Sequence, residues 1–279
     1  MTFRRDPIHL GSGEPVLLLH PFLCSQQVWS TVGPKLADTG RFEVFAPTMA
    51  GHHGGPEAGT WFLNSELLAD HAERQLDELG WDTAHIVGNS LGGWVAFELE
   101  RRGRARTLTG IAPAGGWSQW SPVKFETVAK FLGGGPVLLA ARLLGPRILG
   151  LPFARRIATL PVSGPADGPT QADLVNLVED ATHCRAYFAL LVKTLTLPGL
   201  LELADVQAPV QLVLCEKDRV FPTPRGNRHF LEQLPDTSRV VRLDGLGHIP
   251  MLEAPDLVAE LLIDFLDEHV PPHRSEIPG

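Results

Sequence analysis

One serine of the chain stands in a pattern that is typical of catalytic nucleophiles. Ser90 is the centre of Gly88-Asn89-Ser90-Leu91-Gly92, which has the form G-x-S-x-G and lies between an apolar run and a helix-like segment. A strand that ends in a sharp turn at this serine would expose its hydroxyl, and the flanking glycines would relieve crowding in the turn. The N-terminus of the following helix would favour negative charge developing at the same place. A helix-capping serine in a glycine-rich turn fits the motif equally well. Other residues of a catalytic site are therefore needed to distinguish a nucleophile from a cap.

A serine hydroxyl becomes an effective nucleophile when a neighbouring base accepts its proton. His248 is the candidate base, because it lies in a glycine-containing loop after the last expected strand. Asp218 is the candidate acid that orients the imidazole, because it ends another expected strand, at the edge where the carboxyl ends of parallel strands meet. Glu216 and Asp244 are alternatives. We expect Glu216 to lie deeper in the sheet, and Asp244 is too close in sequence to His248 to reach its ring easily.

The tetrahedral intermediate formed by such a serine needs two backbone donors aimed at one point. Leu91, the residue after the nucleophile, would supply one N–H group. The second would come from the loop after the first apolar run, His20-Pro21-Phe22. Proline has no N–H group, so Phe22 is the nearest donor, and its ring would also form part of the pocket wall.

Short apolar runs alternate with helix-like segments over most of the chain. This alternation predicts an α/β fold with a mostly parallel central sheet and helices on both faces. The apolar runs have the length of strands buried on both faces and cover residues 15–20, 42–47, 84–89, 108–113, 210–218 and 239–245. The helical patterns between them cover residues 25–36, 64–80, 90–102, 225–234 and 256–269.

The alternation stops between about residues 117 and 203, where helical patterns are separated by glycine and proline. We therefore expect residues 1–116 and 204–279 to form the core, and residues 117–203 to form an inserted helical cap over the carboxyl edge of the sheet. The most apolar stretch of this insertion, residues 133–153, is interrupted by two arginines and three prolines. We expect short helices there and no membrane span.

Composition excludes some classes of function. The chain has 279 residues and a formal net charge of −8, so it has no basic excess with which to bind nucleic acid. No apolar segment follows the N-terminal arginines, so no signal peptide is expected. The three cysteines are odd in number and have no metal-binding spacing, which fits a reducing, cytoplasmic location. His52 and His53 are adjacent and cannot easily bind one ion, and no third ligand is evident, so no metal is expected.

Taken together, these motifs resemble the α/β-hydrolase family. They are most similar to its cap-bearing members related to bacterial esterases, carbon–carbon bond hydrolases and cofactor-free haloperoxidases. The resemblance implies a triad of Ser90, Asp218 and His248, and a structural role for a histidine in the turn at residues 51–55. The segments that carry it are residues 20–22, 46–55, 88–92, 215–222 and 245–255.

Several residues depart from the family's patterns. Many relatives carry glycine at the position of Pro21 and aspartate at that of Thr48, and ring-cleavage hydrolases often carry tryptophan at that of Ile249. The last departure argues against carbon–carbon cleavage. Epoxide hydrolases and haloalkane dehalogenases of this fold resemble the chain but carry aspartate as the nucleophile, so Ser90 argues against both activities.

The insertion is locally basic in an acidic chain. Residues 117–156 contain six basic residues and one acidic residue, Glu126, together with aromatic residues and a leucine-rich run. One interpretation is an apolar, positively rimmed entrance for an acyl or aromatic substrate. Another is a solvated helix face whose arginine stems cover apolar surface. A transient contact with an acidic membrane surface, without stable insertion, is a third.

We predict from these features a serine hydrolase of the carboxylesterase type. Its substrates would be small-molecule carboxylic esters or thioesters, cleaved through an acyl-enzyme on Ser90 without a cofactor. The alternatives are a carbon–carbon bond hydrolase of a diketone-type substrate, an acyltransferase, and a slow-turnover ligand receptor that retains the triad. The sequence leaves the natural substrate and the oligomeric state open.

Overall fold

The computed structural model describes residues 3–60, 63–159, 161–162, 168–200 and 202–270. Seven strands form one sheet in the order β1-β3-β2-β4-β5-β6-β7. The sheet is parallel except at one edge, where β1 pairs antiparallel with β3. The strands are β1 (Ile8–Gly11), β2 (Glu14–Leu19), β3 (Phe42–Ala46), β4 (Ala84–Asn89), β5 (Ala105–Ile111), β6 (Val210–Cys215) and β7 (Arg239–Leu243).

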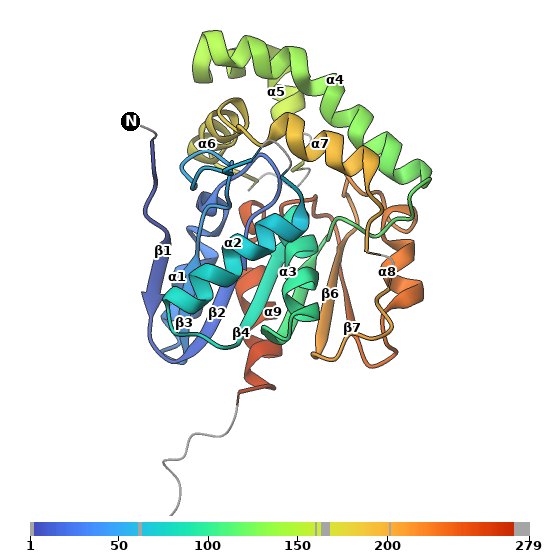
Figure 1. The fold of residues 1–279 in the computed structure, drawn as a ribbon. Coiled ribbons are helices and arrows are strands. Elements are labelled where there is room, and N and C mark those ends of the chain that lie inside the picture. Colours follow the sequence, from blue (N-terminus) through green and yellow to red (C-terminus); the bar gives the residue numbers. More distant parts are fainter. Residues whose placement is uncertain (1–2, 61–62, 160, 163–167, 201, 271–279) are drawn as a thin grey trace, which may run out of the picture.

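The sheet confirms the predicted fold class. All six predicted strands are present, and the mostly parallel sheet carries helices on both faces (Figure 1). Alternate residues of β2 belong to different cores: Leu17 and Leu19 pack with helices α2 and α3, whereas Val16 and Leu18 pack with α1 and α9. Neither face of such a strand meets solvent, which is why its sequence is apolar throughout.

The core helices follow the predicted segments closely. Asn64 caps α2, because its side-chain oxygen accepts a hydrogen bond from Leu67 N at 2.9 Å, and Gly80 follows the end of that helix. The helices of the core are η1 (Gln26–Trp29), α1 (Val32–Ala37), α2 (Ser65–Glu78), α3 (Leu91–Arg101), η3 (Arg225–Asn227), α8 (Arg228–Gln233), η4 (Pro250–Leu252) and α9 (Pro255–Asp267).

The chain between β5 and β6 is helical and contains no strand in its described part. Figure 1 shows these helices gathered above one end of the strands, at the top of the view, with α4 as the outermost element. Thr170 and Asp173 form a reciprocal capping box at the start of α6. The helices are α4 (Pro122–Leu144), η2 (Gly145–Gly150), α5 (Pro152–Ala158), α6 (Gln171–Thr182) and α7 (Tyr187–Thr196).

Helix α4 is longer than predicted. We expected glycine and proline to break the apolar stretch into short helices, but α4 continues through Gly133 and Pro136 to Leu144. Proline removes a single backbone hydrogen bond. The carbonyl that loses its donor belongs to Leu132, which lies with Pro136 on the exposed side, where water can bind it. By length and composition Pro122–Gly150 could cross a membrane, although core helices can meet the same criterion.

Candidate active site

Ser90 occupies the sharp turn between β4 and α3. Its backbone has φ 55° and ψ −114°, a conformation that is strained for a residue with a side chain. Backbone hydrogen bonds fix this turn. Ser90 N donates to Ile111 O at 3.0 Å, and Ser90 O accepts from Ala114 N at 2.9 Å. The strained turn expected from the sequence is present, and neighbouring strand β5 holds it in place.

Three glycines around the turn have no room for a side chain. A Cβ atom on Gly88 would lie 2.2 Å from Gly92 O, and one on Gly92 would lie 2.3 Å from Leu19 O. A Cβ atom on Gly93 would lie 2.7 Å from the Cβ of Pro113. Strand, turn and helix therefore pack at distances that only glycine allows, as the spacing of the motif predicts.

His248 and Asp218 form a buried pair. His248 Nδ1 lies 2.7 Å from Asp218 Oδ2, and each residue is 4% exposed. The other carboxylate oxygen, Oδ1, accepts hydrogen bonds from Val220 N at 2.7 Å and Phe221 N at 2.8 Å. The carboxylate is thus held at both oxygens. It fixes the imidazole with Nδ1 protonated and leaves Nε2 able to accept a proton.

The expectation that Glu216 lies deeper than Asp218 was wrong. Strand β6 ends at Cys215, so Glu216 lies in the exposed turn that follows. Its side chain binds Lys217 and accepts from Gly245 N, and these hydrogen bonds lower the pKa of Glu216. Asp244 is exposed as well, so Asp218 is the acidic residue that contacts His248.

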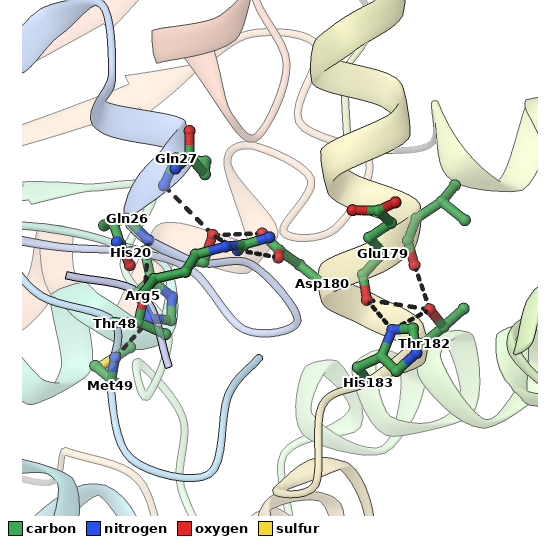
Figure 2. Close-up of polar contacts among 12 residues, drawn as sticks. Arg5, His20, Gln26, Gln27, Thr48, Met49, Glu179, Asp180, Thr182 and His183 are labelled. Atoms are coloured by element: carbon green, nitrogen blue, oxygen red, sulfur yellow. Dashed lines mark hydrogen bonds and ion pairs between the residues drawn. The ribbon is translucent and has the colours of Figure 1, made fainter. Parts of the chain in front are cut away.

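The loop that carries Phe22 is braced by a buried histidine. His20 Nδ1 donates to Pro21 O at 2.8 Å. His20 Nε2 accepts from Met49 N at 2.9 Å (Figure 2). Burial lowers the pKa of His20 well below its ordinary value, which keeps the ring neutral and suits this donor–acceptor pattern. His20 therefore fixes the peptide next to Phe22.

A mainly apolar cavity of about 160 Å³ joins these residues. Ser90, His248 and Phe22 lie on its wall, whereas Asp218 lies behind His248 and Leu91 does not line the cavity. Leu91 is the first residue of α3, where N–H groups have no acceptor within the helix. The chain between β5 and β6 supplies most of the wall: Lys130, Phe131, Gly134, Val137, Leu138, Ala141, Ile148, Ala154, Ile157, Pro161, Leu177, Val178 and Ala181.

Lys130 is the charged residue among those that line the cavity. Its Nζ donates to Arg219 O at 2.8 Å and Val220 O at 3.0 Å. Burial lowers its pKa. These bonds tie helix α4 to the loop that follows Asp218.

Asn89 was not identified from the sequence as a site residue. Its Nδ2 donates to Ile111 O at 2.9 Å and to His248 O at 3.0 Å. This side chain therefore links the turn of Ser90 to the loop that carries the imidazole. The partners come from distant segments, so no local sequence signal indicates the contact.

A second missed cluster joins helix α6 to the N-terminal part of the chain. Arg5 contacts Asp180 of α6 at 2.5 Å and Ser25 Oγ at 2.7 Å, and Ser25 Oγ also donates to Asp180 (Figure 2). Burial raises the pKa of Asp180, and the hydrogen bonds from Ser25 and Arg5 oppose this shift. Because α6 lines the cavity, the cluster fixes one cavity wall to the loop that follows Phe22.

The adjacent histidines face different neighbours. The His52 ring lies 4.9 Å from that of His20, whereas the His53 ring lies 4.9 Å from Phe3 and 4.8 Å from His183. Burial lowers the pKa of His52 to about 4, so this ring is neutral near pH 7. Within the described ranges, no three histidine, cysteine or acidic residues are grouped as metal ligands.

Comparison with known proteins matches residues 16–261 to the alpha/beta hydrolase family. The chain is 59% identical over 213 residues to epoxide hydrolase EphH of Mycobacterium tuberculosis, which covers 76% of this chain and 100% of that protein. It is 30% identical over 268 residues to a pimeloyl-[acyl-carrier protein] methyl ester esterase of Aromatoleum aromaticum, covering 89% and 96%. A thermophilic esterase from Thermogutta terrifontis has a TM-score of 0.71 at 21% identity over 95% of this chain and 93% of that chain, which shows the shared fold.

Proposed function

The chain belongs to the α/β-hydrolase family and is a hydrolase, and from this premise we propose that it cleaves small carboxylic esters or thioesters through an acyl-enzyme on Ser90. The observation that carries the proposal is the pairing of His248 with Asp218 at 2.7 Å, on the cavity that Ser90 also lines. The methyl ester esterase among the relatives supports an ester substrate.

The proposed reaction has two halves. Ser90 Oγ attacks the acyl carbonyl carbon while His248 Nε2 takes the hydroxyl proton, and the N–H groups of Phe22 and Leu91 bind the oxyanion. Collapse of this intermediate breaks the bond to the alcohol or thiol, which leaves with the proton from His248. A water molecule then attacks the acyl-enzyme with His248 as base, releases the acid and restores Ser90.

We propose that the insertion, residues 117–203, acts as a cap that selects the acyl group. Its α4, α5 and α6 side chains supply most of an apolar wall, which favours an apolar acyl chain over a charged one. The leaving group would not need the same apolar surroundings, so both esters and thioesters fit.

Epoxide hydrolysis is the second candidate, because the 59% identical relative is named an epoxide hydrolase. Attack by Ser90 on an epoxide would form an ether, which His248-activated water would not cleave as it cleaves an ester. Epoxide opening would instead require direct attack by water and a proton donor for the epoxide oxygen. The one tyrosine of the chain, Tyr187, donates its hydroxyl to Phe131 O at 2.7 Å. These points favour acyl chemistry.

A substrate panel with matched serine variants tests the proposal. We expect the wild-type chain to hydrolyse p-nitrophenyl esters, and Ser90→Ala to lose roughly a thousandfold or more in kcat. Ser118→Ala, at an exposed serine, should be unaffected. Styrene oxide should not be hydrolysed by either variant.

Other outcomes would replace the proposal. If ester turnover survives in Ser90→Ala, Ser90 is not the nucleophile. Rapid opening of styrene oxide would show that the chain is an epoxide hydrolase. Stoichiometric labelling by a fluorophosphonate without turnover would indicate a receptor, and cleavage of a diketone in preference to esters would indicate a carbon–carbon hydrolase.

We also propose a cytoplasmic location. The support is that Cys24, Cys184 and Cys215 are all buried and unpaired, as is usual in a reducing compartment. Burial raises the pKa of each thiol, which keeps the cysteines unreactive.

A further inference from the structure

Helix α4 is apolar on two opposite faces, of which one lies outside the protein. Its inner face includes Leu138 and Ala141 on the cavity wall. Its outer face carries Phe125, Leu132, Leu139 and Leu143, whose exposed fractions are 41%, 49%, 66% and 82%. Their spacing of seven, seven and four residues places them on one side of the helix. They form an apolar stripe about 27 Å long.

The apolar surface continues beyond the end of α4. Leu151 and Phe153, at the junction of η2 and α5, are 53% and 69% exposed. Ile148 and Ala154 of the same two elements are buried on the cavity wall. One layer of helices thus separates the cavity from the outer apolar surface, and Figure 1 shows α4 with no element beyond it.

The far end of this surface is strongly cationic. Residues 133–158 contain four arginines and no acidic residue, although the whole chain has a net charge of −8. The arginines are exposed, and none forms an ion pair with a residue that the structure describes. They are Arg142, Arg147, Arg155 and Arg156. Such a charge distribution attracts an anionic surface.

The near end carries an aromatic pair. Trp120 is 79% exposed, and its ring stacks on Phe125 with a centroid distance of 6.5 Å. Exposed tryptophan beside an apolar helix face is typical of elements that lie in the headgroup layer of a membrane.

We propose that the outer face of α4, together with Leu151 and Phe153, docks on an anionic lipid surface with the helix parallel to that surface. The apolar stripe would enter the headgroup–acyl boundary, and the four arginines would bind lipid phosphates. A second copy of the chain fits this face less well, because like-charged arginines would face each other without carboxylates. An acidic protein could form ion pairs with the arginines, but its charge would not account for the long apolar stripe beside them.

The same helix does not span the bilayer. Its inner face packs on the protein, and Pro136 has no N–H group to donate to the carbonyl of Leu132. That carbonyl can bind water in the headgroup layer, whereas in hydrocarbon it would be costly. The docked state is therefore peripheral and reversible.

Docking would bring the cavity beside the lipid acyl chains. An apolar acyl substrate could then pass between the helices of the insertion without crossing water. This consequence rests on the proposed function, whereas the binding itself does not require Ser90.

Vesicle flotation of the full chain tests the proposal. We expect binding to phosphatidylcholine vesicles that contain about 30% phosphatidylglycerol, weaker binding to pure phosphatidylcholine, and loss of binding in high salt. Leu143→Ser/Phe153→Ser should weaken binding roughly tenfold or more. Arg142→Glu/Arg147→Glu should weaken it roughly fivefold per arginine or more.

Matched variants on another surface distinguish binding at this face from nonspecific adsorption to the vesicles. Leu257→Ser, at a residue that is 46% exposed on α9, and Arg242→Glu, at an exposed residue of β7, should bind vesicles like the wild type. Ser90→Ala should also bind normally, and the Leu143→Ser/Phe153→Ser chain should keep its hydrolysis of a soluble short ester. Failed ester hydrolysis with intact vesicle binding would therefore refute only the proposed function.

Three results would overturn the docking proposal. The first is no flotation with anionic vesicles, and the second is equal binding by the patch variants. The third is that the chain does not bind vesicles and instead associates with itself or with an acidic protein, and that the same substitutions abolish this association.

Discussion

The side-chain amide of Asn89 donates a 3.0 Å hydrogen bond to the backbone carbonyl of His248. The residue before the proposed nucleophile thus holds the loop that carries the proposed base. The same amide donates to Ile111 O on β5, so the Asn89 side chain connects the turn of Ser90, the sheet and the loop of His248.

Replacing Asn89 should therefore misplace the imidazole without removing it. We expect Asn89→Ala to lower kcat for p-nitrophenyl butyrate by about 10–100-fold, with little change in KM, because a shift of about 1 Å in a catalytic group has an effect of this size. Steady-state kinetics would measure it. If KM rose and kcat stayed constant, Asn89 would shape substrate binding instead.

The two acidic residues near the end of β6 should behave differently. Asp218→Asn removes the negative charge beside His248 and should lower kcat by about 10²–10⁴-fold. Glu216→Gln changes an exposed residue and should leave kcat near the wild-type value. Equal losses in both variants would show that Asp218 has no special role.

Two glycine substitutions should have opposite effects on stability. In Gly92→Ala the new Cβ would lie 2.3 Å from Leu19 O, so the free energy of unfolding should fall by about 3 kcal/mol. In Gly133→Ala the new Cβ meets no atom within 4 Å and lies in a helix, so the free energy should rise by about 0.5–1 kcal/mol. Urea denaturation of both variants would check the signs.

Stability should fall in mild acid because His52 is buried as a neutral ring. Its folded pKa of about 4 lies below the ordinary value of 6.5, so the unfolded chain binds the proton more readily between these pH values. The loss begins near pH 6.5 and reaches the order of 3 kcal/mol near pH 4. His52→Asn should flatten this slope in pH-dependent denaturation, while His20 retains part of it. An unchanged slope would contradict this origin.

The cluster of Arg5, Ser25 and Asp180 should matter more than a surface ion pair. Asp180→Ala leaves a partly buried guanidinium without its carboxylate and should lower the free energy of unfolding by about 3 kcal/mol. Arg185→Ala breaks an exposed pair with Glu57 and should cost less than about 1 kcal/mol. Similar losses in the two variants would mean that the buried cluster contributes no more than a surface pair.

Local patterns predicted the sheet and the turn of Ser90 because the physical constraints there are local. A strand buried on both faces must be apolar, and the crowded turn requires Gly88 and Gly92. Strand β1 was missed because it is four residues long and mostly exposed, so its residues show no apolar pattern. Glu216 was wrongly predicted to be buried, because a sequence pattern does not locate the end of a strand to within two residues.

Contacts between distant segments could not be predicted in the same way. Asn89 meets His248 across 159 positions, and Arg5 meets Asp180 across 175. Such pairs form only when the sheet and the helices between β5 and β6 are assembled. The length of α4 was misjudged for a related reason: packing of its inner face offsets what Gly133 and Pro136 cost locally.

Leu138 and Leu139 are neighbours in the chain but meet different surroundings. Leu138 lines the cavity, and Leu139 is 66% exposed on the outer face of α4. On the proposals made for the two faces, a change at the first position should alter which substrates fit, and a change at the second should alter binding to lipid. Evolution or an engineer can therefore adjust chemistry and location separately, by substitutions one residue apart on a single helix.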